Sequence, residues 1–240
     1  MDSPNRPALL VLIRHGESLR NALKGSSTYY RSDEVRESAK GIADHDIPLV
    51  DEGWRQARQT GLGLHAKFGA PDYLYHSGYR RTKETADGIL EAYSDDERAR
   101  IKIRSNLFLR ERDSGYAYDM TETEARLSFP WLKEHWETFG GFMARPPGGE
   151  SLADVMMRAY LVVNMLFRDR RGQKVFLVTH GGTIRCLRCV LERQSIDEAT
   201  RTHGPRNCGL VIYEPDATTG RLVLCENDVV LWSDTPKADG

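Results

Sequence analysis

The sequence predicts an α/β sandwich with a largely parallel central sheet. Short apolar segments typical of buried strands alternate along the chain with segments whose apolar residues recur at spacings of three and four, as in amphipathic helices. Strands that alternate with helices favour a parallel sheet covered by helices. The 240 residues contain no Pro/Ser-rich linker, internal repeat or low-complexity tract, so we expect a single domain over residues 1–240.

Six segments are expected to form strands. Residues 9–13 (LLVLI) have the aliphatic and β-branched content of a strand that is buried on both faces. The expected strands cover residues 8–13, 72–76, 101–104, 175–179, 208–213 and 221–232, with the weakest patterns at 101–104 and 221–232.

Two long helices are expected between these strands. In residues 52–68 and 151–168 the apolar side chains recur at three and four, which gives each helix one face to bury. Ser151 with Asp154, and Ser195 with Glu198, resemble capping boxes and predict where two helices begin.

Two polar segments interrupt the alternation of strands and helices. Residues 22–47 are too long for an ordinary connection, so we expect them to be either disordered or a functional loop. Residues 112–149 combine short helical patches, aromatic residues and the turn-forming sequence RPPGG. We interpret this second segment as an insertion that caps one edge of the sheet.

The charge balance of the sequence bears on whether the protein binds nucleic acid or membranes. The 34 Lys and Arg residues balance 35 Asp and Glu residues, which gives no general electrostatic reason to expect nucleic acid or an anionic membrane as a partner. No apolar segment approaches the length of a membrane span and none precedes the first strand, so we expect a soluble, cytoplasmic protein. The oligomeric state has no signature in the sequence.

The four cysteines are expected to be reduced core thiols. Cys186 and Cys189 have the spacing of a zinc-ligand pair, but they lie in a helical pattern and no second pair is nearby. Cys208 and Cys225 are flanked mostly by aliphatic residues. We therefore predict no metal site from the cysteines.

Charged side chains follow three of the expected strands at the point where each strand ends. Arg14 and His15 follow the first strand, and Arg81 opens a helix after the second. His180 follows the strand at 175–179, together with the backbone N–H of Gly181. Ligands of parallel sheets bind at the carboxyl ends of strands, near helix N-termini, so these groups are expected to converge. Guanidinium forks bind phosphate oxygens in pairs, which makes a phosphoryl group the expected ligand.

The same residues predict a nucleophile. Nearby arginines disfavour protonation of histidine, so one ring nitrogen keeps its lone pair near neutral pH. An unprotonated imidazole that faces a bound phosphorus is a nucleophile, and the arginines stabilise the transferring group without a metal. Glu111 is the best candidate by position for the proton donor, because a partly buried carboxyl beside a phosphate dianion favours its protonated form.

Six motifs in sequence order resemble those of the histidine phosphatase superfamily, in its phosphoglycerate-mutase-like branch (branch 1). The motifs are RHGES (14–18) followed by Asn21, DIPLVDEGWRQA (46–57), SGYRRTKETA (77–86), LRERDSG (109–115), GGES (148–151) and VTHGGTIR (178–185). The resemblance covers about residues 8 to 213. It implies a three-layer α/β/α sandwich with a mostly parallel central sheet, a cap formed by insertions near 22–47 and 112–149, and hydrolysis with no metal and no organic cofactor.

The resemblance also implies a role for each residue of the expected site. His15 becomes the phosphohistidine, and Glu111 is the proton donor and later the base for water. The implied phosphate ligands are Arg14, Asn21, Arg81, His180 and the backbone amide of Gly181. The motif selects Arg81 over its neighbour Arg80, which we expect on the exposed side of the turn.

Three functions stay open for such a site. Transfer to water makes a phosphatase, whereas transfer to a retained hydroxy acid makes a cofactor-dependent phosphoglycerate mutase. The family's mutases carry a tyrosine just after the glutamate motif, adjacent arginines in the cap and usually an asparagine in place of Gly182. This chain continues with Ser114 after the glutamate motif, and its basic residues between 112 and 149 are never adjacent. We therefore predict phosphomonoester hydrolysis of a small phosphorylated substrate. A non-catalytic binding protein of the same fold is disfavoured, because His15, Glu111 and His180 are all present.

Several other residues have plainer explanations than catalysis. Glu17 is interpreted as an acidic residue in the first turn of a helix. The histidines at 45, 65, 76, 135 and 203 are interpreted as structural or solvated, and the tryptophans at 131 and 136 as packing residues. Possible substrate contacts in the two insertions are Ser26, Ser27, Tyr29, Tyr30, Tyr116 and Tyr118.

Overall fold

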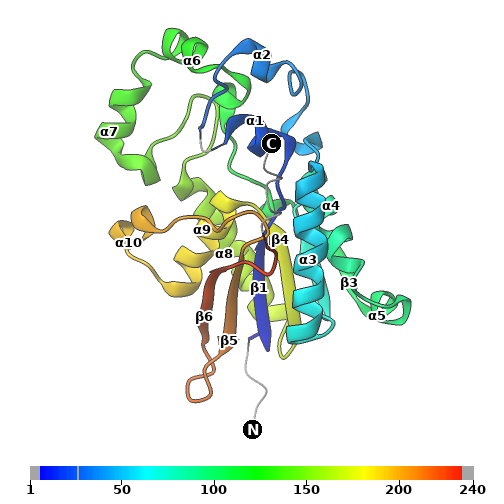
Figure 1. The fold of residues 1–240 in the computed structure, drawn as a ribbon. Helices are drawn as coiled ribbons and strands as arrows, with labels where there is room; N and C mark the ends of the chain where they lie inside the picture. The colour runs from blue at the N-terminus through cyan, green and yellow to red at the C-terminus, as the bar shows by residue number, and fades with distance from the viewer. Residues whose placement is uncertain (1–5, 26, 234–240) are drawn as a thin grey trace.

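The computed structural model describes residues 6–25 and 27–233, and its strands form one sheet (Figure 1). The strands are β1 (Leu9–Arg14), β2 (Tyr73–His76), β3 (Lys102–Ser105), β4 (Lys174–Thr179), β5 (Leu210–Pro215) and β6 (Leu222–Val229). Their order is β3-β2-β4-β1-β5-β6, and all six start within two residues of the expected positions. β3, β2, β4 and β1 pair in parallel, while β5 is antiparallel to β1 and β6 to β5. The mostly parallel sheet is confirmed.

Helices cover both faces of the sheet. One face packs against α3 (Asp51–Phe68) and α4 (Arg80–Leu90), and the other against α8 (Leu152–Asp169) and α9 (Gly181–Glu192). Successive strand side chains point to opposite faces. Along β1, Leu10 and Leu12 therefore join the core cluster of α8 and α9, whereas Val11 and Ile13 join that of α3 and α4. The three-layer α/β/α sandwich is confirmed.

The predicted helix starts are also present. Ser151 and Asp154 form a reciprocal capping box at the start of α8, and Ser195 and Glu198 form one at α10 (Ile196–Arg201). Each box satisfies backbone N–H groups that a helix start leaves without partners. The remaining helical segments outside the cap are α5 (Asp95–Arg100) and the 3₁₀ turn η2 (Leu107–Leu109).

The two polar segments together form a cap above the ends of the parallel strands (Figure 1). The first contains the end of α1 (Leu19–Lys24), α2 (Asp33–Arg36) and the 3₁₀ turn η1 (Asp44–Asp46), and the second contains η3 (Gly115–Asp119), α6 (Glu122–Ser128) and α7 (Leu132–Met143). Tyr30 joins them, because its N–H donates to Met120 O at 3.1 Å and its carbonyl accepts from Glu122 N at 3.1 Å. Arg36 adds an ion pair with Glu124 at 2.7 Å.

The thiols only partly follow the prediction. Cys186, Cys189 and Cys208 are free and buried, as expected, but Cys225 is free and exposed. The prediction is wrong for Cys225 because it lies on β6, an edge strand in which only Leu222 is buried. Among the described residues, no group of three or more His, Cys, Asp and Glu side chains is placed to hold a metal ion.

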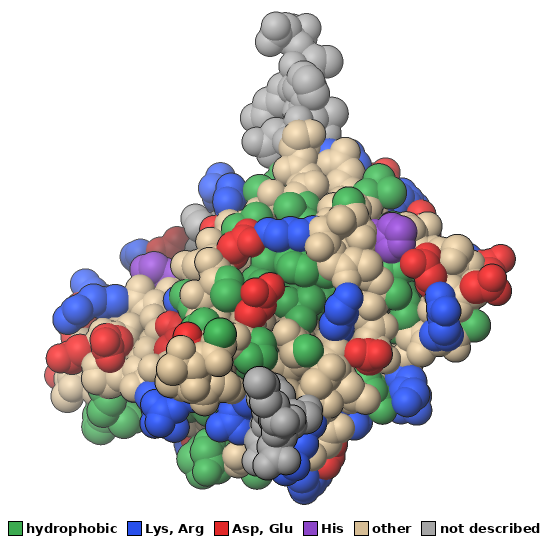
Figure 2. Space-filling model, turned by 90° about the horizontal axis from the view of Figure 1, so that it is seen from below, with side chains coloured by type: hydrophobic (Ala, Val, Ile, Leu, Met, Phe, Trp, Pro, Cys, Tyr) green, Lys and Arg blue, Asp and Glu red, His purple; other side chains and the backbone are tan. Residues whose placement is uncertain are grey.

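The surface carries charges of both signs. Figure 2 shows Lys and Arg side chains interspersed with Asp and Glu around a hydrophobic centre on one face of the molecule. No helix within the described ranges combines the length and apolar character that crossing a membrane requires.

Candidate active site

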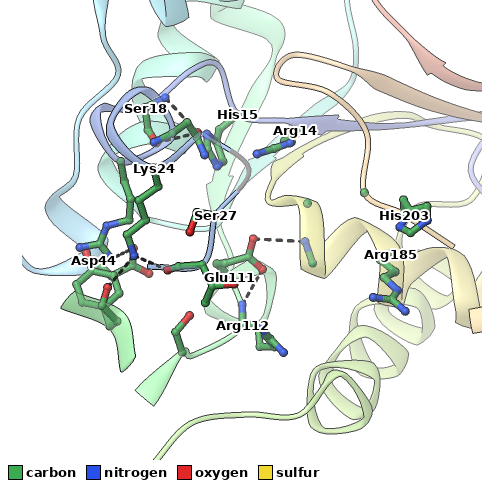
Figure 3. A pocket seen from close by; sticks show the side chains of 18 of the residues that line it. Arg14, His15, Ser18, Lys24, Ser27, Asp44, Glu111, Arg112, Arg185 and His203 are labelled. Carbon is green, nitrogen blue, oxygen red and sulfur yellow. Dashed lines mark hydrogen bonds and ion pairs between the residues drawn. The ribbon is translucent and has the colours of Figure 1, made fainter. Parts of the chain in front are cut away.

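A cavity of about 700 Å³ opens at the carboxyl ends of the parallel strands, under the cap (Figure 3). Arg14 and His15 after β1, Arg81 in the first turn of α4, Glu111, and Gly181 at the start of α9 all line it. The structure therefore brings together groups that are up to 167 residues apart in the sequence (14 to 181). The His180 ring lies behind them, fully buried, with its centroid 5.1 Å from that of His15.

His15 is fixed in one tautomer. Its Nδ1 lies 2.7 Å from Gly16 O, and since a carbonyl only accepts, Nδ1 carries the proton and Nε2 keeps the lone pair. Burial, together with the charges of Arg81 and Arg14, holds the pKa of His15 well below its usual range. His15 is therefore a neutral imidazole with a free nitrogen at physiological pH.

The loop that carries His15 passes directly over the start of α3. A Cβ on Gly16 would lie 2.5 Å from Gly53 O, so only glycine fits at position 16. The N–H of Gly16 donates to Thr85 Oγ1 of α4 at 3.0 Å. These contacts fix the direction in which the His15 side chain leaves the strand.

His180 is held from behind by a hydroxyl group. Its Nε2 lies 2.9 Å from Ser77 Oγ, and its buried Nδ1 has no hydrogen-bond partner among the described residues. Burial is the main reason that the pKa of His180 lies well below its usual range, and Arg81 adds to the effect. A second neutral imidazole thus lies next to the first, with one nitrogen unused.

The two arginines of the site are held differently. Arg14 donates from Nη1 to the neutral carbonyl of Pro205 at 2.9 Å, and its buried Nε has no partner among the described residues. Arg81 donates from Nη1 to the backbone carbonyl of Asp44 and lies 3.1 Å from the Asp44 carboxylate. Arg80 is exposed, as expected, and it pairs with Glu84.

Glu111 faces the cavity between two backbone amides. Its Oε1 accepts from Arg112 N at 2.7 Å and its Oε2 accepts from Gly182 N at 3.3 Å. A Cβ on Gly182 would lie 2.6 Å from Glu111 Oε1, so the glycine makes room for the carboxylate. The segment before Glu111 is fixed by Thr179 and Thr183, whose hydroxyls each donate at 2.6 Å to the carbonyls of Leu109 and Arg110.

Arg158 is a residue that the sequence reasoning missed. It is buried on α8, and its Nη1 donates to the carbonyls of Phe108 and Arg110 at 2.8 and 2.7 Å. Its Nη2 donates to the carbonyl of Glu111 at 3.1 Å, and Glu150 supplies the balancing charge at 3.1 Å. The sequence does contain one indication of this role: Arg158 is a charged residue next to Ala159, on the apolar face of an amphipathic helix.

The expected residue Asn21 also lines the cavity. It is the third residue of α1, and its Oδ1 accepts from the Ser18 N–H at 3.2 Å and from Asn207 Nδ2 at 3.3 Å. The side-chain N–H group of Asn21 is therefore the part of this residue that can donate to a ligand. The prediction for Glu17 is wrong: Ser18 caps α1, so Glu17 precedes the helix, and its N–H donates to Gln56 Oε1 at 3.0 Å.

Of the other residues considered in the sequence, some line the cavity and others lie away from it. His203 and Trp136 line the cavity. Ser27 and Tyr118 also line it, whereas Tyr30 is fully buried and Tyr116 is 70 % exposed outside it. Ser26 lies outside the described residues. His45, His65 and His76 have local partners in Asp46, Glu97 and the Gly78 amide, and His135 lies among the aromatic rings of Trp131, Trp136 and Phe139.

Residues 10–228 match the sequence model of the histidine phosphatase superfamily (branch 1). The chain belongs to this superfamily. Among its relatives, a 2,3-bisphosphoglycerate-dependent phosphoglycerate mutase of Methylobacterium radiotolerans is 32% identical over 230 residues, which cover 92% of this chain and 97% of the relative. The enzyme of the same name from Rhizobium etli is 30% identical over 200 residues, covering 82% and 86%.

Solved structures of other proteins share the histidine phosphatase fold. Bacillus stearothermophilus YhfR superposes with a TM-score of 0.70 at 25% identity, covering 93% of this chain and 98% of that one. A mycobacterial glucosyl-3-phosphoglycerate phosphatase in complex with VO3 gives a TM-score of 0.66 at 23% identity, covering 95% and 100%. Membership of the superfamily, with phosphoglycerate mutases among the relatives, supports an enzyme that hydrolyses or transfers phosphoryl groups.

Proposed function

We propose that the protein hydrolyses small phosphomonoesters through a phosphohistidine on His15, without a metal. The observation that carries this proposal is the state of His15. It is a buried, neutral imidazole that lines the cavity with Arg14 and Arg81, and its Nδ1–H donates to Gly16 O, which leaves Nε2 with its lone pair. A neutral nitrogen among cations is the arrangement that a nucleophile for phosphorus needs.

In the first step, Arg14, Arg81, the Gly181 amide and Nδ1 of His180 bind the phosphate oxygens, and Asn21 adds its amide. Nε2 of His15 forms a bond to phosphorus as the ester P–O bond breaks. The leaving alkoxide takes its proton from Glu111. The arginines neutralise charge on the equatorial oxygens during the transfer.

In the second step, water replaces the alcohol. The Glu111 carboxylate, now deprotonated, takes a proton from that water as its oxygen attacks the phosphohistidine. The N–P bond breaks, phosphate leaves, and His15 returns to its neutral form. Glu111 thus alternates between acid and base, and the Gly182 amide, which donates to its Oε2, stabilises the carboxylate form that takes the proton from water.

Gly182 favours hydrolysis over mutase chemistry. The family's mutases usually have an asparagine at this position, but a side chain here would meet Glu111 Oε1 at 2.6 Å and displace the carboxylate. The cap also lacks the adjacent arginines of the mutases.

A second candidate function is mutase-type transfer, and two observations favour it. Several relatives with about a third of residues identical are named as phosphoglycerate mutases. In addition, Arg112 and Arg185 line the cavity, and no acidic side chain pairs with either in the described part of the chain. Such guanidinium groups could bind a substrate carboxylate.

One pair of assays decides between these functions. The purified protein is incubated with p-nitrophenyl phosphate in the presence of a chelator, and then with 3-phosphoglycerate plus a trace of 2,3-bisphosphoglycerate. We expect release of phosphate by the wild type and a loss of at least about 1,000-fold in His15→Ala. Equal release by both proteins would refute the proposal, and isomerisation faster than release would favour the mutase.

A further inference from the structure

Arg81 is paired with a carboxylate of the cap, whereas Arg14 is not. Asp44 contacts Arg81 three times: its carbonyl accepts from Nη1, its Oδ1 lies 3.1 Å from Nη1, and its Oδ2 accepts from Nη2 at 3.4 Å. These contacts occupy Nη1 and the edge between Nη1 and Nη2, so Nη2 keeps one hydrogen, on the side of Nε. The edge formed by Nε and Nη2 is left for a ligand, and that edge is a bidentate fork.

Asp44 is itself held in place from several directions. It lies in η1, lines the cavity, and is 4.0 Å from Arg20, which also pairs with Asp119 at 3.6 Å. Figure 3 shows it on the side of the cavity away from Arg185 and His203. The chain after η1 is anchored independently, because Leu49 N donates to Glu84 on α4 at 2.7 Å.

We infer that Asp44 is a positioning residue that aims the free fork of Arg81 at the phosphate and limits how tightly phosphate binds. This inference rests on the proposed function of the site. The contacts orient the guanidinium group before substrate arrives, which favours turnover. The Asp44 carboxylate and the phosphate dianion both interact with Arg81, and the two negative groups repel each other. This repulsion weakens the binding of both substrate and product.

Removal of the charge has two opposite effects. In Asp44→Asn the backbone contact to Arg81 remains and the side chain keeps its size, so the change removes mainly the charge. We expect inorganic phosphate to bind about tenfold more tightly, from the Coulomb energy of one unit charge across the shared arginine. We expect kcat to fall several-fold, because Arg81 loses part of its orientation and product leaves more slowly.

The test uses calorimetric titration with inorganic phosphate and turnover of p-nitrophenyl phosphate by the same preparations. Asp119→Asn is the matched control, because it removes a carboxylate that pairs with Arg20 and not with Arg81. The control should change phosphate affinity by less than about twofold. Asp44→Ser, which removes the same charge, replaces Asp44→Asn if that variant does not fold.

The outcomes separate this inference from the proposed function. Tighter phosphate binding by Asp44→Asn alone supports the inference, even if no ester is hydrolysed and the proposed function fails. A wild type that hydrolyses esters, with unchanged or weaker phosphate binding in Asp44→Asn, overturns only the inference. An equal effect of Asp119→Asn also overturns it, and a wild type that does not bind phosphate overturns both.

Discussion

The sharpest prediction concerns Arg158, which never touches the cavity yet fixes the segment that carries Glu111. In Arg158→Met three backbone carbonyls lose a charged donor, whereas Glu150 keeps its ion pair with Arg110 at 2.6 Å and its hydrogen bond from Asp113 N at 2.9 Å. Breaking a buried ion pair costs about 3–5 kcal/mol, and we take the lower end because Glu150 stays paired. About 3 kcal/mol lowers the melting temperature of a domain of this size by roughly 10 °C.

The catalytic effect should depend on the leaving group. An aryl phosphate leaves without much help from an acid, whereas an alkyl phosphate needs the proton from Glu111. We expect kcat/KM of Arg158→Met to fall about tenfold more for an alkyl phosphate than for p-nitrophenyl phosphate, since the acid is present but poorly placed.

Arg188→Met is the control for this measurement. Arg188 is also a buried arginine with a carboxylate partner, Glu192 at 2.9 Å, but its other hydrogen bond goes to Asn227 and not to the segment that carries Glu111. It should lose stability without changing the ratio of the two substrates. The reasoning is refuted if Arg158→Met loses equally on both esters, or if Arg188→Met changes the ratio as much.

Three further predictions concern Gly182, the two buried histidines and Lys24. In Gly182→Ala the new Cβ meets Glu111, so turnover of alkyl phosphates should fall at least about tenfold while phosphate binding is retained; equal loss of both would contradict this. The pKa values of His15 and His180 are lowered, so below about pH 6.5 the unfolded chain binds more protons and the melting temperature should fall, with a smaller fall in His180→Gln. Burial lowers the pKa of Lys24 to about 8. Because the unfolded chain binds the extra proton up to about pH 10.4, the free energy of unfolding should rise between these two values, and Lys24→Met should remove that slope in denaturant titrations.

The sequence predicts the parts of the molecule that depend on neighbouring residues. The apolar content of β1, the spacing in α3 and α8, and the capping boxes are local, and all are present. The rule that ligands bind at the carboxyl ends of parallel strands was enough to predict that His15 and Arg81 lie at one cavity. Cys225 was assigned wrongly, because exposure at a sheet edge depends on the strand order and not on the residues beside it.

The unpredicted residues depend on contacts between distant segments. Asp44 contacts Arg81 across 37 positions and Arg158 contacts Glu111 across 47, with no fixed spacing that a single sequence reveals. Trp136 and His203 lie in regions where aromatic and polar patterns fit packing or solvent equally well. Their positions follow from how the cap folds over the strand ends.

The site must stay folded while it is empty, and this requirement explains the state of its nucleophile. Two arginines and two histidines lie close together at the cavity, and all but Arg14 are buried, so four positive charges would repel each other strongly. Burial and the arginines keep both imidazoles neutral, and Asp44 balances one of the two remaining charges. The excess positive charge is then small enough to bury and is of the right sign for a phosphate dianion. The conditions that make the empty site stable therefore leave His15 as a free nucleophile, so stability and reactivity have the same physical cause.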